Sequence, residues 1–180
     1  MARQALIIID MQRGSFDAAP RHDAEGLVRR LNGLAARMRR RGDAVVWVQH
    51  EGPPGDPFHP SAPGFALLAG LDADPGDRFV RKASCDAFLG TALAGLLAEA
   101  GAERLVVTGC ATDFCVDTTV RSALGRGHAT LVPVDGHTTA DRPHLAATRI
   151  IEHHNAIWAE FISPAGPALA CRCDEIAAEG

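Results

Sequence analysis

Residues 107–116 read Val-Thr-Gly-Cys-Ala-Thr-Asp-Phe-Cys-Val, and they join an apolar run to a helical pattern. The apolar run, residues 104–108, predicts a buried strand, and the helical pattern extends from 114 to 125. A strand that passes through a tight turn at Gly109 directly into a helix is the repeating unit of a parallel α/β sheet. This junction therefore predicts an α/β fold, and it puts Cys115 in the first turn of a helix.

The same alternation of short apolar runs and longer amphipathic segments extends over most of the chain. Strands separated by helices of this length indicate parallel pairing with right-handed crossovers. Residues 51–77 are rich in Gly, Pro and Asp, which predicts a long loop with a short helical turn near 64–70. The tail after Pro164 has too weak a pattern to assign. The other expected strands are 5–10, 44–49, 78–82, 129–134 and 159–162, and the other expected helices are 24–41, 87–100 and 142–157.

The bulk composition is that of a single globular domain over residues 1–180, with 47% hydrophobic and 22% charged residues. The net charge of −4 argues against nucleic acid as a partner, because phosphate binding needs a basic face. The basic run Arg37–Arg41 ends a helical pattern, where cations complement the helix dipole.

No apolar stretch approaches about 18 residues, and the N-terminus leads directly into an apolar strand, so we expect neither a membrane span nor a cleavable signal. The five cysteines lack zinc-site spacing, which favours reduced thiols in the cytoplasm.

Lys82 is the one lysine in a chain that otherwise uses arginine for positive charge. It closes the stretch Arg78-Phe79-Val80-Arg81-Lys82, which predicts a strand that runs into a loop. Lysine has a compact ammonium group whose pKa shifts readily on burial. Ligands bind at the carboxyl ends of strands in open α/β sheets. We therefore expect Lys82 in a functional site, although a surface lysine without a role would fit the same position.

Two further reactive residues come at strand ends. Asp10 follows the apolar residues of the first strand, and Cys115 begins the helix after 104–108, where the helix dipole favours a thiolate. A cysteine that only fills space and an aspartate that only caps a turn are the structural alternatives. Together with Lys82, however, three strand ends bring an acid or base, a cation and a thiol to one edge of the sheet. This set favours a catalytic triad.

An ordered set of short motifs surrounds these three residues. It consists of Ile-Ile-Ile-Asp10-Met-Gln12, of Lys82 followed by Asp86, Phe88, Thr91 and Leu93, of Gly109-x-x-Thr112-x-x-Cys115-Val116-x-x-Thr119, and of Ala123, Gly127 and Asp135. This set resembles the isochorismatase-like cysteine hydrolases, a superfamily that includes nicotinamidases, N-carbamoylsarcosine amidases and ureidoacrylate amidases. The resemblance covers about residues 5–160, and its specificity lies in the order of the motifs.

The resemblance implies a three-layer domain with a six-stranded parallel sheet flanked by helices, and a triad of Asp10, Lys82 and Cys115. It also implies a cis peptide bond between Cys110 and Ala111, an oxyanion hole formed by the amides of Ala111 and Cys115, and a homo-oligomer. Members that cleave the vinyl ether of isochorismate lack this cysteine, whereas amidases keep it. Cys115 therefore predicts hydrolysis of the C–N bond of a small amide or ureido substrate through a thioester. In this mechanism Asp10 takes the thiol proton, and Lys82 favours the thiolate.

The chain departs from the nicotinamidase pattern after the second strand. Nicotinamidases bind a divalent metal there through an Asp-x-His pair, whereas this chain has Gln49-His50-Glu51-Gly52. His50 and a stray His59 do not make a metal site. We therefore expect no metal, no cofactor and no nicotinamidase activity.

Five residues at strand ends or in the adjoining loops are candidates for substrate binding. Gln12, Gln49 and His50 can hydrogen-bond a carbamoyl or carboxamide group, and Phe16 and Phe114 can cover a small pocket. Core packing is the alternative for the aromatic residues.

Two other functions fit parts of the pattern. A non-catalytic binding or regulatory protein would use the same pocket without turnover. A nucleotide-binding protein would need a glycine-rich phosphate loop after the first strand, and neither G-x-G-x-x-G nor a P-loop follows residues 5–10.

Overall fold

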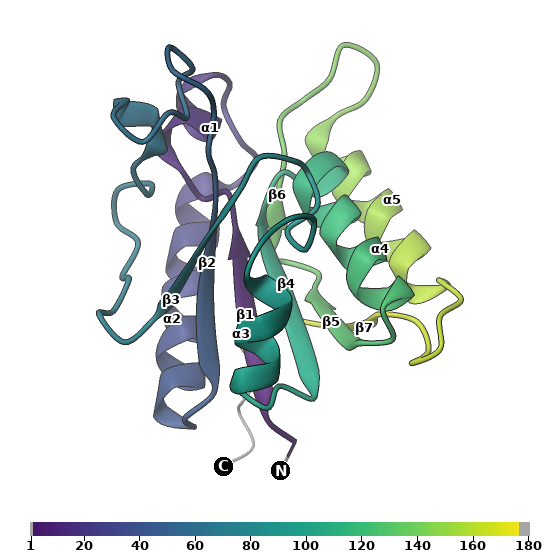
Figure 1. Ribbon diagram of the computed structural model, residues 1–180. Helices are drawn as coiled ribbons and strands as arrows, with labels where there is room; N and C mark the ends of the chain where they lie inside the picture. Colours follow the sequence, from purple (N-terminus) through teal and green to yellow (C-terminus); the bar gives the residue numbers. More distant parts are fainter. Residues whose placement is uncertain (1, 177–180) are drawn as a thin grey trace.

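One parallel sheet organises the chain, of which the computed structural model describes residues 2–176. Six strands lie in the order β3-β2-β1-β4-β5-β7, and the short β6 pairs with the end of β4 (Figure 1). Every strand pair is parallel, so the predicted α/β fold with a six-stranded parallel sheet flanked by helices is confirmed. The strands are β1 (Gln4–Ile9), β2 (Ala44–His50), β3 (Arg78–Lys82), β4 (Arg104–Cys110), β5 (Ala129–Pro133), β6 (His137–Thr138) and β7 (Leu169–Cys171). The α-helices are α1 (Arg13–Asp17), α2 (Ala24–Arg40), α3 (Leu93–Glu99), α4 (Asp117–Gly125) and α5 (Ala147–Ala159).

The central strand β1 divides its buried side chains between two cores, because successive residues of a strand point to opposite faces. Ile7 and Ile9 belong to the core that contains buried apolar residues of α3 and α4 and Trp158 of α5. Leu6 and Ile8 belong to the core formed with α2 and with the C-terminal residues up to Ile176. The helices therefore cover both faces of the sheet. No helix within residues 2–176 is long and apolar enough to cross a lipid bilayer.

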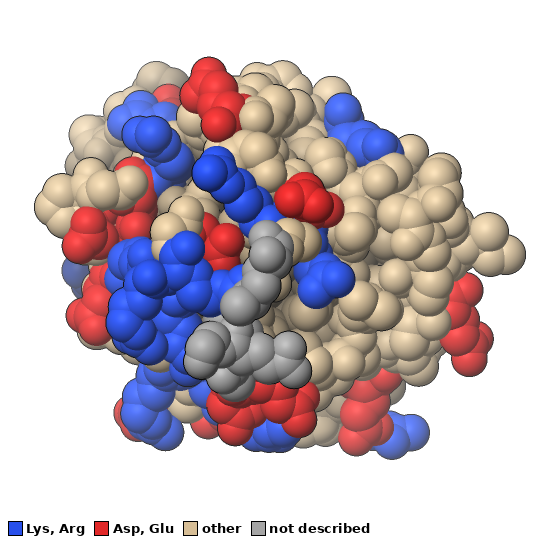
Figure 2. All heavy atoms as spheres, turned by 90° about the horizontal axis from the view of Figure 1, so that it is seen from below, with Lys and Arg blue, Asp and Glu red and all other residues tan. Residues whose placement is uncertain are grey.

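Helix α2 has the amphipathic character that its sequence predicts. Leu27, Leu31, Leu34 and Met38 are all fully buried against the sheet. Basic residues cluster at its carboxyl end, as predicted from the run 37–41. Seen from below the sheet, basic side chains gather beside acidic ones (Figure 2). At the carboxyl end of α2, opposite charges form the ion pairs Arg39–Asp77 (2.6 Å) and Arg41–Asp43 (3.0 Å).

Two helices begin later than the periodicity predicts. The expected helix 87–100 starts at Leu93, because side chains hold the preceding residues in a loop; for example, Thr119 Oγ1 accepts from Ala87 N at 3.1 Å. The expected helix 142–157 starts at Ala147, whose amide donates to Asp141 Oδ1 at 2.8 Å.

The expected strand at 159–162 is wrong, and the sixth strand lies in the tail that the sequence left unassigned. Helix α5 extends to Ala159, and Ile162 is 96% exposed, so this apolar stretch does not join the sheet. β7 instead pairs with β5, with Val132 opposite Ala170. The short α1 and β6 were also missed, since five and two residues are too few to give a periodic signal.

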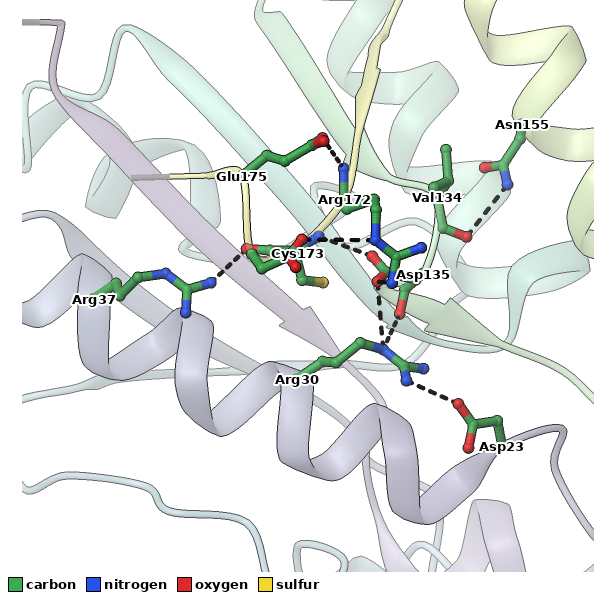
Figure 3. Close-up of polar contacts among 10 residues, drawn as sticks. Asp23, Arg30, Arg37, Val134, Asp135, Asn155, Arg172, Cys173 and Glu175 are labelled. Atoms are coloured by element: carbon green, nitrogen blue, oxygen red, sulfur yellow. Dashed lines mark hydrogen bonds and ion pairs between the residues drawn. The ribbon is translucent and has the colours of Figure 1, made fainter. Parts of the chain in front are cut away.

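Asp135 anchors the C-terminal tail beside α2 (Figure 3). Its Oδ1 accepts from Cys173 N at 2.8 Å, and its Oδ2 lies 3.0 Å from Arg172 Nη2. Arg30 of α2 donates to the Asp135 carbonyl at 2.8 Å, and Arg37 donates to the carbonyl of Cys173. The tail thus contacts the carboxylate of Asp135, and α2 contacts its backbone carbonyl.

Candidate active site

Three reactive side chains meet where β1, β3 and β4 end. Asp10 follows β1, Lys82 is the last residue of β3, and Cys115 lies in the π-helical turn Thr112–Val116 that follows β4. Lys82 Nζ donates to Asp10 Oδ2 at 2.7 Å and lies 3.3 Å from Cys115 Sγ. It also donates to the carbonyl of Ser84 at 2.9 Å. Because an ammonium group has three donors, every donor of the buried Lys82 has a partner.

The sheet register explains how Asp10 and Lys82 come together across an intervening strand. β2 lies between β1 and β3, with His50 opposite Lys82. Asp10 N donates to Val48 O of β2 at 2.8 Å. Asp10 has a φ of 47°, in the left-handed region that aspartate tolerates better than most residues. This left-handed conformation turns the backbone, so β1 ends just before the residue that carries the carboxylate.

Gly109 allows β4 to pass close to β1 just before the turn that holds Cys115. Its φ is 115°, and a Cβ at this position would lie 2.2 Å from the carbonyl oxygen of Ile9. Only glycine fits such a close backbone approach. The next peptide bond, between Cys110 and Ala111, is cis.

The turn that carries Cys115 is held by polar contacts from β6 and from the loop between β6 and α5. Thr112 Oγ1 lies 2.9 Å from His137 Nδ1. Asp113 accepts from Thr139 Oγ1 at 2.5 Å and from Arg142 Nε at 2.9 Å. The sequence predicted one helix from 114 to 125, whereas a π-helical turn precedes α4, so Cys115 lies before the α-helix and not in its first turn.

The charges around Cys115 favour a protonated thiol in the resting site. Burial raises the pKa of the Cys115 thiol, and the carboxylate of Asp10 raises it further, against the opposing effect of Lys82. Burial alone would lower the pKa of Lys82, but the charge of Asp10 and the contacts of Lys82 with Asp10 and Cys115 outweigh burial and raise it. The helix dipole, which from the sequence favours a thiolate at Cys115, is therefore opposed by burial and by Asp10. The mechanism expected from the sequence, in which Asp10 takes a proton from the thiol, stays a prediction.

A cavity of about 390 Å³ opens onto these residues. Of the residues named from the sequence, Asp10, His50, Ala111, Phe114 and Cys115 line it. Its other lining residues are Ser15, Arg21, Phe58, Ala83, Ser84, Cys85, Cys110 and Arg142. The geometry thus brings a thiol, a carboxylate and the backbone of Ala111 to one small hollow.

Three predicted substrate-binding residues lie outside this cavity. Gln12 is fully buried; its Oε1 accepts from His50 N at 2.7 Å, and its Nε2 donates to His50 O at 3.0 Å. Gln49 Nε2 donates to Phe65 O at 2.9 Å. Phe16 lines a different hollow, together with Val28 of α2. The amides therefore fasten the loop after β2 to the sheet, and we leave all three residues out of the proposed binding site.

The sequence interpretation missed Arg21, Ser84 and Arg142 at the cavity wall. A usable signal was present for Ser84, which is two residues beyond Lys82 and so comes shortly after a strand end. Arg21 lies between α1 and α2, where no strand end marks it. Arg142 follows no strand directly, and only the fold brings it beside Asp113.

Within residues 2–176, no group of three or more His, Cys, Asp or Glu side chains is arranged to hold a metal ion. His59 Nδ1 instead lies 2.7 Å from Ser61 Oγ. The expectation that the protein uses no metal stays a prediction.

A family model of the isochorismatase domain matches residues 4–161. The chain belongs to the isochorismatase family. A streptothricin hydrolase of Streptomyces noursei is 38% identical to it over 143 residues, which cover 78% of this chain and 56% of that protein. A ureidoacrylate amidohydrolase of Methylorubrum extorquens is 30% identical over 186 residues, which cover 82% of this chain and 75% of that protein. This isochorismatase-family chain thus spans about half the length of the streptothricin hydrolases that it matches.

Solved structures show the same architecture. A crystal structure of an isochorismatase family protein has a TM-score of 0.85 at 32% identity and covers 93% of this chain and 97% of that chain. The N-carbamoylsarcosine amidase from Thermoplasma acidophilum has a TM-score of 0.78 at 22% identity, with 99% of each chain covered, and shares the fold.

Proposed function

We propose that this isochorismatase-family protein is a cysteine-dependent hydrolase that cleaves the C–N bond of a small amide or ureido compound. The observation that carries the proposal is Lys82, which bridges Asp10 at 2.7 Å and Cys115 at 3.3 Å beside a cavity of about 390 Å³. A thiol, a base and a cation in this arrangement match the requirements of covalent catalysis. Relatives named as amidohydrolases support the bond type.

In the proposed first half-reaction, Asp10 removes the thiol proton as the Cys115 sulfur attacks the substrate carbonyl. Asp10 Oδ1 is buried and has no hydrogen-bond partner within the described chain, so it is available for this proton. The backbone amides of Ala111 and Cys115 stabilise the negative oxygen of the tetrahedral intermediate. The intermediate then collapses as Asp10 gives the proton to the departing nitrogen, and ammonia or an amine leaves.

The second half-reaction returns the enzyme to its resting state. Asp10 takes a proton from water, and the resulting hydroxide attacks the thioester carbonyl. The C–S bond breaks, the acid product leaves, and the Asp10 proton returns to Cys115. Lys82 stays protonated throughout and stabilises whichever of its two partners is negatively charged.

The test is a screen of small primary amides and ureido acids for ammonia release, run with the wild type and with Cys115→Ala. A covalent acyl-enzyme should also be detected by intact mass after rapid acid quench, and only in the protein that retains Cys115. A non-catalytic binding protein would bind such compounds without ammonia release and without any mass increase, and that result would overturn the proposal.

We further propose a cytoplasmic location and a homo-oligomer. The five cysteines are all unpaired, as expected in a reducing compartment. Large apolar side chains are exposed on the isolated chain, including Phe79 (50%), Leu89 (63%) and Ile162 (96%), and a contact between copies would cover them. Light scattering that gives the 19.0 kDa mass of one chain at micromolar concentration would contradict the oligomer.

A further inference from the structure

The wall of the Cys115 cavity carries two arginines, and one of them is neutralised by the protein itself. Arg142 Nη2 lies 2.8 Å from Asp113 Oδ2, and its guanidinium carbon lies 5.0 Å from the centre of the Phe114 ring. Lys82 and Asp10 form a second balanced pair at 2.7 Å. These four charges cancel within the site.

Arg21 is the lining cation that has no carboxylate partner within residues 2–176. Its Nε donates to the carbonyl of Ser15 at 2.7 Å, which fixes the side chain at the cavity edge. On its other side Arg21 borders the hollow that contains Glu25 and Arg29, whose charges are opposite, and no ion pair joins it to Glu25. The cavity therefore carries a surplus positive charge, and the terminal amino groups of Arg21 are free to donate.

We propose that Arg21 binds a carboxylate of the substrate, so that the preferred substrates are small amides or ureido compounds that also carry an acid group. A guanidinium fork matches the two oxygens of a carboxylate and holds them in one orientation. Arg21 lines the same cavity as Cys115, and its bond to the carbonyl of Ser15 occupies only Nε. Cationic amides are disfavoured for the same reason, because Arg21 repels them. That the bound acid is a substrate rests on the proposed function, but the binding of an anion at Arg21 does not depend on turnover.

Two alkylating reagents of similar size test the anion site directly. Iodoacetate carries a carboxylate and iodoacetamide does not, so the ratio of their rates at a cavity cysteine measures attraction of the negative charge. Peptide mass spectrometry gives this ratio separately for Cys115 and for Cys85, which is exposed on the same wall. The proteins to compare are the wild type, Arg21→Met, Arg21→Lys and the control Arg13→Met. Arg13 is exposed, pairs with Asp17 and does not line the cavity.

The expected result is a fall of about tenfold in the iodoacetate-to-iodoacetamide ratio in Arg21→Met, since one nearby charge is lost in a partly desolvated site. Arg21→Lys should keep most of the wild-type ratio because the charge remains, and Arg13→Met should match the wild type within about twofold. The wild-type preference should also weaken as salt is added. An equal ratio in wild type and Arg21→Met, at both cysteines, overturns the anion site.

Steady-state kinetics separates the two proposals. For the matched pair ureidoacetate and ethylurea, Arg21→Met should raise the KM of the acid by about tenfold or more relative to that of the uncharged urea. Loss of the alkylation preference without hydrolysis of any amide would leave the carboxylate site standing and remove the hydrolase. Hydrolysis of amides, with an iodoacetate-to-iodoacetamide ratio that is unchanged in Arg21→Met, would keep the hydrolase and remove the carboxylate site.

Discussion

His137 links the turn that holds Cys115 to α5, with its Nδ1 2.9 Å from Thr112 Oγ1 and its Nε2 3.0 Å from Asn155 Oδ1. Its ring also meets Trp158 edge-on at 5.1 Å between centroids. Burial lowers the pKa of His137 from its ordinary 6.5 to about 4. A neutral imidazole is therefore built into the folded protein close to Cys115.

This depressed pKa makes stability depend on pH in a defined direction. The unfolded chain binds a proton at His137 near pH 6.5, and the folded chain binds it only near pH 4. The contribution of neutral His137 to the free energy of unfolding is therefore fully present above pH 6.5 and is lost as the pH falls toward 4. Between pH 7 and 5 the loss should reach about 2 kcal/mol. Urea unfolding at both pH values should show this extra loss in the wild type and not in His137→Gln. His144→Gln, which alters an exposed histidine, should retain the wild-type pH dependence.

Cys115→Ala should remove turnover and leave the fold intact. The thiol is the proposed nucleophile, and loss of a nucleophile costs several orders of magnitude in rate, on the order of 10⁴-fold or more. The side chain is half-buried and the volume change is small, so the melting temperature should change little. Cys171→Ala, on the distant β7, serves as the control and should retain activity. A tenth of the wild-type rate in Cys115→Ala, on a verified substrate, would end the covalent mechanism.

Lys82→Arg should be nearly as damaging as Lys82→Ala, although it keeps the charge. The three donors of the ammonium point to Asp10, Cys115 and Ser84 within a fully buried site, and a planar guanidinium is too large to replace it. A shift of about 1 Å in Cys115 can cost on the order of 100-fold in rate. The adjacent Arg81 is exposed, so Arg81→Lys should leave kcat within about twofold. Near-normal turnover in Lys82→Arg would show that the triad has been assigned wrongly.

Gly109→Ala should destabilise the protein by at least about 3 kcal/mol, because the new Cβ meets the Ile9 backbone and the φ of 115° disfavours a side chain. Gly125, the last residue of α4, has no neighbouring atom within 4 Å of an added Cβ. Gly125→Ala should therefore be neutral or stabilise by about 0.5–1 kcal/mol. Chemical denaturation of the two variants compares them directly. Equal stabilities would mean that β4 does not need a glycine to approach β1.

The parts of the fold that the sequence predicted well are those with a repeating pattern. The face of α2 formed by Leu27, Leu31 and Leu34 repeats at helical spacing, and β1 is an unbroken apolar run. The sixth strand was misplaced because Phe161 and Ile162 are apolar without being in the sheet, whereas β7 has only three residues and is half exposed. Short edge strands are specified by their neighbours more than by their own residues.

The candidate site was also predicted only in part from the sequence. Asp10, Lys82 and Cys115 were expected to meet because each lies at or just after the end of a strand, and the topology of a parallel sheet brings strand ends to one edge. Gln12 comes after β1 and Gln49 lies near the end of β2, but backbone groups of His50 and Phe65 occupy their side chains, and no local pattern reveals such partners. The protonation state of Cys115 could not be predicted either, because it depends on burial and on the distance to Asp10.

The tail anchored by Asp135 has a practical consequence for anyone who shortens this protein. The family match ends at residue 161, yet β7 and the buried Cys173 and Ile176 come after it. A chain cut at that boundary would lose an edge strand, expose the unpaired side of β5 and open the core beneath α2. Such a fragment would offer a bare strand edge to other copies of itself and should aggregate even though every residue of the triad is present.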